Sequence, residues 1–394
     1  MNSKKILIII VLAQFCCTSL WFAGNAIMND LILNFNLSSD NLAYLTSAVQ
    51  FGFIIGTLLF AILTISDRFS PSKVFFVCAT LGGIINLCIT IESNTLTTLL
   101  LLRFLTGFFL AGIYPIGMKI ASDYFEKGLG TSLGFLVGAL VLGTAFPHIL
   151  KANQSLITWS SVIYTTSILA ITGGLLMYFL VPDGPFRKVG KKLNPAAFFK
   201  VFKNKSFRGA AFGYFGHMWE LYAFWTFVPI ILKTYIELHP ETQFNIPVLS
   251  FSIIATGSLA CIVGSYIAKS IGTKKTAFYA LLASCCCCLV SPFLFTINSE
   301  FVFIAFLVFW GIVVIADSPL FSTLVAQNAT PEIKGTALTI VNCIGFSITI
   351  ISILLLNKML VNINPTKAYL ILALGPILGL LSLKMNTEKS RFFI

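Results

Sequence analysis

The chain has 394 residues, of which 57% are hydrophobic and only 10% are charged, and its mean hydropathy is +0.92. Because a soluble domain carries about 25% charged and about 45–50% apolar residues, this composition excludes a soluble enzyme, a nucleic-acid-binding module and a disordered chain. The net charge of +12 does not indicate nucleic acid, since the basic residues lie between apolar runs and form no binding face. The composition predicts an all-α membrane protein.

Apolar runs bounded by polar residues predict twelve transmembrane helices. In the first half they cover 6–28, 41–65, 74–92, 96–118, 129–150 and 157–181. In the second half they cover 209–232, 246–268, 276–297, 301–326, 335–356 and 366–383. The first run begins like a signal peptide, but it continues to spanning length without a small-residue cleavage site and is interpreted as a helix.

The only long basic connection is 182–208, and it divides the chain into two predicted six-helix bundles, 1–181 and 209–394, joined by a cytoplasmic linker. With the N-terminus in the cytoplasm, 21 of the 26 lysines and arginines fall inside, four fall outside, and Arg103 is left within the membrane. This asymmetry obeys the positive-inside rule. We therefore expect a multi-pass protein of the cytoplasmic (inner) membrane with both termini in the cytoplasm.

The two halves contain related motifs. Tyr114-Pro115 is followed 15 residues later by Gly130-Thr131-Ser132-Leu133, and Ser318-Pro319 is followed 16 residues later by Gly335-Thr336-Ala337-Leu338. A repeated helical unit of this kind places a binding site between the halves, near the middle of the membrane.

Two further motifs indicate a family. Asp67-Arg68 with Lys73 resembles the loop 2–3 motif of the major facilitator superfamily, although both glycines of that motif are replaced, and Arg103 with Gly107 resembles its helix 4 motif. Over essentially its whole length the chain resembles a transporter of this superfamily. The resemblance implies two six-helix bundles and alternating access to a central site.

A narrower resemblance concerns Gly112–Lys119 and Gly216–Tyr222, which are similar to bacterial members loosely known as nitrate/nitrite- or cyanate-type permeases. Nitrate porters of the superfamily carry arginines within helices 2 and 8 and a Gly/Asn-rich motif in helix 5. This chain lacks these arginines and has no asparagine in helix 5, so nitrate is disfavoured as its substrate. Gly138-Ala139 stands where drug–proton antiporters usually carry Gly-Pro, which weakens a drug-efflux interpretation.

Three charged residues lie deep in the predicted membrane: Arg103, Glu220 and Asp317. A charge at mid-bilayer costs at least about 2.5–3.5 kcal/mol, so each needs a partner, a water-filled cavity or neutralisation. Arg103 is predicted to bind an anionic substrate or a coupling carboxylate; the alternative is an arginine that reaches the outer interface. Asp317 precedes Ser318-Pro319 and either caps a broken helix or lines the cavity.

Glu220, near the middle of helix 7, is the best candidate for proton coupling, because a desolvated carboxylate is readily neutralised by a proton. The alternative is a fixed hydrogen-bonded pair with Arg103 or a tyrosine. His217 lies three residues earlier on the same helical face and is predicted to share a proton or hydrogen bond there. No second such pair exists to support a metal site, so no metal is expected.

Aromatic and polar residues of helices 1, 4 and 7 are predicted to line the substrate pocket, although packing is the more ordinary role of aromatic side chains in membranes. They are Trp21, Asn25, Tyr114, Trp219 and Tyr222. The resemblance to the superfamily implies that Asp67, Arg68 and Lys73 form a cytoplasmic gate, with the acid meeting the positive N-terminus of helix 11; the alternative is a role in topology alone.

These patterns predict a proton-coupled secondary transporter of a small, anionic organic solute. Arg103 would hold the substrate charge and Glu220 the coupling proton. The alternative is proton-driven efflux of lipophilic or cationic compounds, with Glu220 and Asp317 attracting the cation. A membrane enzyme is disfavoured, because the chain lacks a nucleophile–base pair, a metal motif and a nucleotide loop. We expect no cofactor and no nucleic-acid partner; the expected partners are the solute, protons and lipid, and the expected state is a monomer.

Overall fold

The computed structural model describes residues 3–125, 129–152, 158–187, 202–330 and 333–385. The regular structure of these residues is helical throughout, and they include eleven helices that are long and apolar enough to cross a membrane. The predicted all-α membrane fold is therefore confirmed. The remaining expected span, 6–28, is divided into shorter helices and is not among the eleven.

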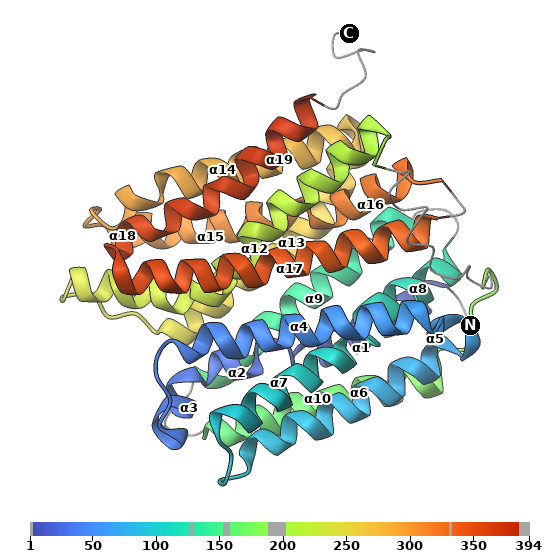
Figure 1. Ribbon diagram of the computed structural model, residues 1–394, viewed down its shortest axis with the longest axis horizontal. Helices are drawn as coiled ribbons and strands as arrows, with labels where there is room; N and C mark the ends of the chain where they lie inside the picture. Colours follow the sequence, from blue (N-terminus) through green and yellow to red (C-terminus); the bar gives the residue numbers. More distant parts are fainter. Residues whose placement is uncertain (1–2, 126–128, 153–157, 188–201, 331–332, 386–394) are drawn as a thin grey trace.

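The first half of the chain runs back and forth along the long axis of the molecule (Figure 1). Its elements are α1 (Ser3–Thr18), α2 (Ala23–Ala26), α3 (Met28–Phe35), α4 (Asn41–Ile62), α5 (Ile65–Arg68), α6 (Pro71–Leu87), the 3₁₀ helix η1 (Cys88–Thr90), α7 (Leu96–Leu110), α8 (Tyr114–Tyr124), α9 (Leu129–Lys151) and α10 (Trp159–Leu180).

The second half forms a similar bundle, drawn above the first in Figure 1. Its elements are α12 (Lys205–Leu238), α13 (Ile246–Ile271), α14 (Thr273–Leu294), α15 (Glu300–Ala316), α16 (Ser318–Asn328), α17 (Lys334–Asn362), α18 (Pro365–Ala368), the 3₁₀ helix η2 (Tyr369–Ala373) and α19 (Leu374–Met385).

Three helices that the sequence predicts as continuous are interrupted. The span 6–28 breaks between α1 and α2, 96–118 breaks between α7 and α8, and 301–326 breaks at Asp317 between α15 and α16. Pro115 and Pro319 each stand in the first turn of the helix that follows the break. A proline there lacks the N–H that would continue the preceding helix, so the two related motifs of the sequence produce related breaks.

The linker predicted at 182–208 lies partly outside the described residues, and α12 already begins at Lys205. Its described start is bound to the first bundle. Ser70 Oγ donates a hydrogen bond to Asp183 Oδ1 at 2.7 Å, and Arg187 Nη2 donates to the carbonyl of Phe69 at 2.8 Å. The limits of the predicted domains at 181 and 209 stay predictions.

The two bundles meet along two seams, α4 with α17 and α9 with α13. In the second seam the glycines approach the opposite helix closely. A Cβ at Gly134 would lie 2.4 Å from Ser265 Oγ, and one at Gly138 would lie 2.9 Å from the Ser258 carbonyl, whereas Gly130 has open space. Small residues here let the backbones of the two bundles touch.

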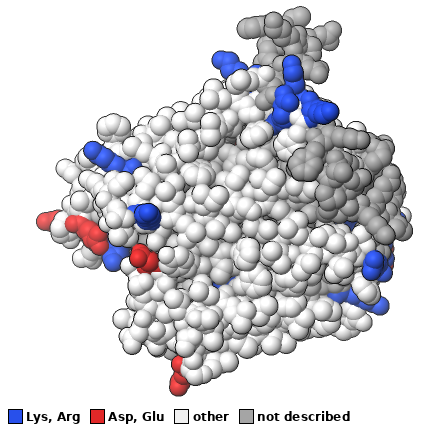
Figure 2. Space-filling view, in the orientation of Figure 1, with Lys and Arg blue, Asp and Glu red and all other residues white. Residues whose placement is uncertain are grey.

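The surface agrees with a membrane-embedded molecule. Figure 2 shows a broad uncharged belt, with lysines and arginines gathered mainly at the end that carries the N-terminus and acidic residues visible only toward the other end. Many large apolar side chains are exposed on the candidate membrane spans, including Phe179, Leu259 and Phe293. Such exposure is expected where hydrocarbon, rather than water, surrounds the protein.

Close helix contact within the first bundle predicts that alanine substitutions at two glycines will differ in their effect on the stability of the protein. A Cβ at Gly52 would lie 1.8 Å from the Phe104 carbonyl oxygen, whereas Gly130 has nothing within 4 Å. We expect Gly52→Ala to force α4 from α7 and cost about 1–3 kcal/mol, as overpacking does, and Gly130→Ala to leave the melting temperature in detergent unchanged. Equal melting temperatures would contradict the tight α4–α7 contact.

Candidate substrate and proton sites

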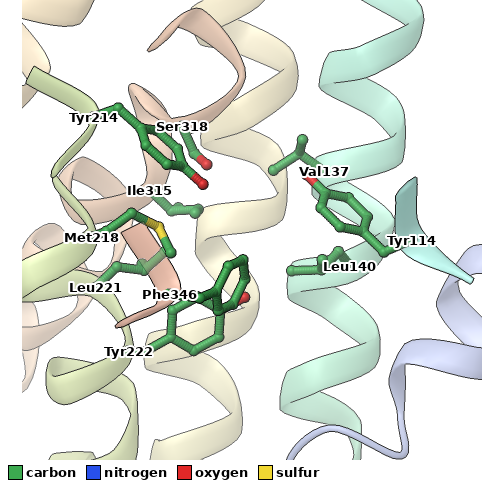
Figure 3. A pocket seen from close by; sticks show the side chains of 10 residues that line it. All are labelled: Tyr114, Val137, Leu140, Tyr214, Met218, Leu221, Tyr222, Ile315, Ser318 and Phe346. Carbon is green, nitrogen blue, oxygen red and sulfur yellow. The ribbon is translucent and has the colours of Figure 1, made fainter. Parts of the chain in front are cut away.

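A cavity lies between the two bundles and is lined by both (Figure 3). Water-sized molecules can occupy only about 20 Å³ of it, which is room for about one water, so the site is narrow in this conformation. Its polar groups are three tyrosine hydroxyls and one serine hydroxyl, and no lining residue carries a formal charge. The lining residues are Tyr114, Val137, Leu140, Tyr214, Met218, Leu221, Tyr222, Ile315, Ser318 and Phe346.

The helix breaks place two of these hydroxyls. Tyr114 is the first residue of α8 and Ser318 is the first residue of α16, and both face the cavity (Figure 3). The repeated motif thus contributes one lining residue from each bundle. Of the predicted substrate residues, Tyr114 and Tyr222 line this cavity.

The α12 face of the cavity was only partly predicted. Tyr214, Met218, Leu221 and Tyr222 all line it, at the i, i+4, i+7 and i+8 spacing of one helical face. This periodicity is visible in the sequence and would have found Tyr214, because Tyr222 was already a candidate. Phe346 of α17 carries no comparable signal, because the polar and apolar residues of this helix are spread around all its sides.

Stacked aromatic rings cover one side of the cavity and join the bundles. The ring of Trp21 stacks at 5.7 Å on both Tyr222 and Phe346, and Phe53 lies 4.5 Å from Phe346. Trp21 is 1% exposed. It therefore forms a layer behind two lining residues, whereas the sequence predicted it in the pocket itself.

Glu220 lies inside the second bundle, away from the cavity wall, and is 1% exposed. Its Oε1 accepts hydrogen bonds from Ser284 Oγ at 2.5 Å, Trp310 Nε1 at 2.6 Å and Cys288 Sγ at 3.2 Å. Three donors converging on one oxygen stabilise a negative charge in a low-dielectric interior. These donors come from α14 and α15. The alternative that the sequence offered, a hydrogen-bonded pair of Glu220 with Arg103 or a tyrosine, is therefore not found.

The predicted histidine and aspartate form a second buried pair in the same bundle. His217 Nδ1 lies 2.8 Å from Asp317 Oδ1, and both side chains are 1% exposed. At the α15–α16 break the Asp317 carbonyl accepts the N–H groups of Leu320 and Phe321, while its side chain makes no capping hydrogen bond. Asp317 thus caps the broken helix through its backbone and binds His217 through its carboxylate.

Arg103 is held by the break in the first helix. It is 2% exposed, its Nη1 donates to the Leu20 carbonyl at 3.1 Å, and its Nη2 donates to the Trp21 carbonyl. Both acceptors lie in the turn between α1 and α2, where the helical hydrogen-bond ladder is interrupted. Within the described residues Arg103 makes no ion pair, and it does not line the cavity.

The other predicted residues lie elsewhere. Asn25 Nδ2 donates to Thr46 Oγ1 at 2.8 Å, and Trp219 Nε1 donates to the Ile371 carbonyl at 2.9 Å, so both serve packing within their own bundle. Of the predicted gate, Arg68 Nε donates to Thr64 Oγ1 at 3.2 Å, Lys73 is exposed, and the side chain of Asp67 lies outside what the structure describes.

Comparison with known proteins identifies the family of this two-bundle fold. Residues 10–353 match the Major Facilitator Superfamily. The chain belongs to this superfamily of membrane transporters. No curated protein sequence matches the chain.

Solved structures of transporters resemble the fold at low sequence identity. The human organic anion transporter MFSD10 (TETRAN) has a TM-score of 0.77 and 12% identity, and the match covers 97% of this chain and 100% of that one. A mutant of the nucleoside transporter NupG has a TM-score of 0.72 and 14% identity, and the match covers 98% and 100%. These likenesses establish the fold, and the narrower resemblance to nitrate- or cyanate-type permeases gains no support from them.

The contacts of Arg103 predict that it supports the break in helix 1. We expect Arg103→Met, which keeps the length but removes both donors, to lower the melting temperature strongly, because each buried carbonyl left unpaired costs about 1–3 kcal/mol. Arg68→Met, at an exposed position, is the matched control and should change it little. A stable Arg103→Met protein would show that the two hydrogen bonds do not hold the break.

Proposed function

We propose that this member of the superfamily is a proton-coupled secondary transporter of a small organic solute. The central cavity would bind the solute between the two bundles and open to each side of the membrane in turn. The observation that supports this most directly is the position of the cavity, which is lined by Tyr114 from the first bundle and by Tyr214, Tyr222 and Ser318 from the second.

The second bundle would carry the coupling proton. It contains two buried acidic sites, Glu220 with its three donors and the His217–Asp317 pair. Neither touches Arg103, so a proton can neutralise either site without breaking an ion pair between the bundles. Intramembrane carboxylates of this kind are the usual elements of proton relays.

An anionic solute is favoured by the position of Arg103. Its guanidinium has no acidic partner among the described residues, and it donates to the carbonyl of Trp21, whose ring stacks on Tyr222 and Phe346 of the cavity. A single residue, Trp21, therefore connects the positive charge of Arg103 to the lining residues of the cavity. In a low-dielectric site such a charge attracts an anion without direct contact.

The alternative is efflux of lipophilic or cationic compounds. It is supported by the apolar part of the lining, which includes Leu140, Met218 and Leu221, and by the two acidic sites behind it. In both versions we propose a monomer in the cytoplasmic membrane with its two termini in the cytoplasm, as the distribution of lysines and arginines indicates.

The substrate class can be tested by thermal stabilisation of the purified protein, because a ligand that binds only the folded state raises the melting temperature. We expect benzoate or malate to stabilise the protein more than tetraphenylphosphonium does. Tyr214→Phe should reduce this stabilisation, while Tyr164→Phe, whose side chain is 48% exposed and does not line the cavity, should not. Stabilisation by tetraphenylphosphonium alone would favour the efflux alternative.

Proton coupling predicts a separation of two transport activities. With the stabilising compound in proteoliposomes, Glu220→Gln should abolish accumulation driven by a pH gradient and retain exchange across the membrane, since the neutral amide can no longer exchange a proton. Glu237→Gln is the control, because Glu237 lies on the same helix but is 63% exposed. Full accumulation in Glu220→Gln would remove Glu220 from the coupling mechanism.

A further inference from the structure

A second hollow lies on the outside of the second bundle, and it shares no lining residue with the central cavity. It is formed by α13, α14 and α15, and water-sized molecules can occupy about 250 Å³ of it. Small residues form its floor and larger, partly exposed apolar residues form its sides. It is lined by Ala260, Val263, Gly264, Ile267, Ile271, Thr276, Tyr279, Ala280, Ile312 and Ala316.

The hollow is a groove open to hydrocarbon. Val263, Ile267, Ile271 and Tyr279 are between 43% and 59% exposed, and these side chains lie on helices that are long and apolar enough to span a membrane. At the floor, a Cβ on Gly264 would lie 3.1 Å from the Ala316 carbonyl oxygen. The absence of a side chain at this position therefore contributes to the depth of the groove.

One end of the groove is chemically different from the rest. Ile271 and Thr276, which flank the turn between α13 and α14, both line it. The helix α14 starts there at Thr273 with a glycine as its N-cap and no side-chain capping hydrogen bond. Its first N–H groups and its positive dipole end thus lie at the mouth of the groove, where an anion is favoured.

Basic side chains add to this positive end. Lys274 and Lys275 belong to the first turn of α14, and Lys269, in the last turn of α13, lies with its Nζ 4.8 Å above the ring of Tyr266. No acidic residue occurs between Glu241 and Glu300. An apolar groove that ends at a cationic turn complements a molecule with an apolar chain and an anionic head.

We propose that this groove binds an anionic phospholipid, with one acyl chain lying between α13, α14 and α15 and the phosphate beside the first turn of α14 and the exposed Lys275. The site is separate from the transport cavity, and the proposal does not depend on the substrate. A bound lipid would stabilise the folded protein by mass action. It would also fill space between helices of the second bundle on the side facing the membrane.

The test compares lipids by the stability they confer. Purified full-length protein would be titrated in detergent with phosphatidylglycerol and, separately, with phosphatidylcholine of the same acyl chains, and the melting temperature followed. We expect phosphatidylglycerol to bind more tightly. The variant Lys275→Gln should weaken it about 5-fold, the loss expected for one lysine near a lipid headgroup. Lys358→Gln, an exposed lysine of α17, should not.

A second variant tests the groove itself. Ala280→Phe should fill it and abolish stabilisation by phosphatidylglycerol, whereas Leu282→Phe, at an exposed position of the same helix outside the lining, should retain it. Equal stabilisation by both lipids, or unchanged binding in Ala280→Phe, would overturn the proposal. So would a native mass measurement in which Ala280→Phe converts a dimer to a monomer, because the groove would then be covered by a second copy of the chain.

Discussion

Every charge inside this molecule must find its partners within the chain, because hydrocarbon provides none, and this constraint organises the fold. Arg103 is held by two backbone carbonyls, Glu220 by three side-chain donors, and Asp317 by His217. Each set of partners lies within one bundle. The bundles can therefore move against one another without exposing an unpaired charge, which is what alternating access requires.

The helix breaks serve this constraint and shape the cavity at the same time. An interrupted helix exposes carbonyls and N–H groups that must be paired. At the α1–α2 break Arg103 supplies the donors, and at the α15–α16 break the Asp317 carbonyl accepts two N–H groups. The breaks at Tyr114 and Ser318 also bring these two residues to the cavity wall, so a backbone feature positions the polar groups of the site.

The sequence predicted the helical fold and the buried charges well, because both follow from the cost of placing polar groups in a membrane. It predicted the partners poorly. Ser284, Cys288 and Trp310, which surround Glu220, come from two other helices, and the sequence alone does not say which of the second bundle's helices pack against Glu220. Trp21 was a pocket candidate for its residue type, yet its position behind the wall depends on how two bundles meet, which is a tertiary property.

Under the proposed function, the substrate and proton sites are connected by one peptide bond. Ser318 lines the cavity, while the preceding residue, Asp317, contacts His217 in the interior of the bundle. A solute that binds the Ser318 hydroxyl contacts the first residue of α16. Any shift of this helix changes the geometry of the His217–Asp317 pair. Because interiors are close-packed, such a shift occurs between discrete arrangements rather than continuously. The break in helix 10 thus supplies a short physical route by which binding of the solute biases protonation, and by which protonation biases release.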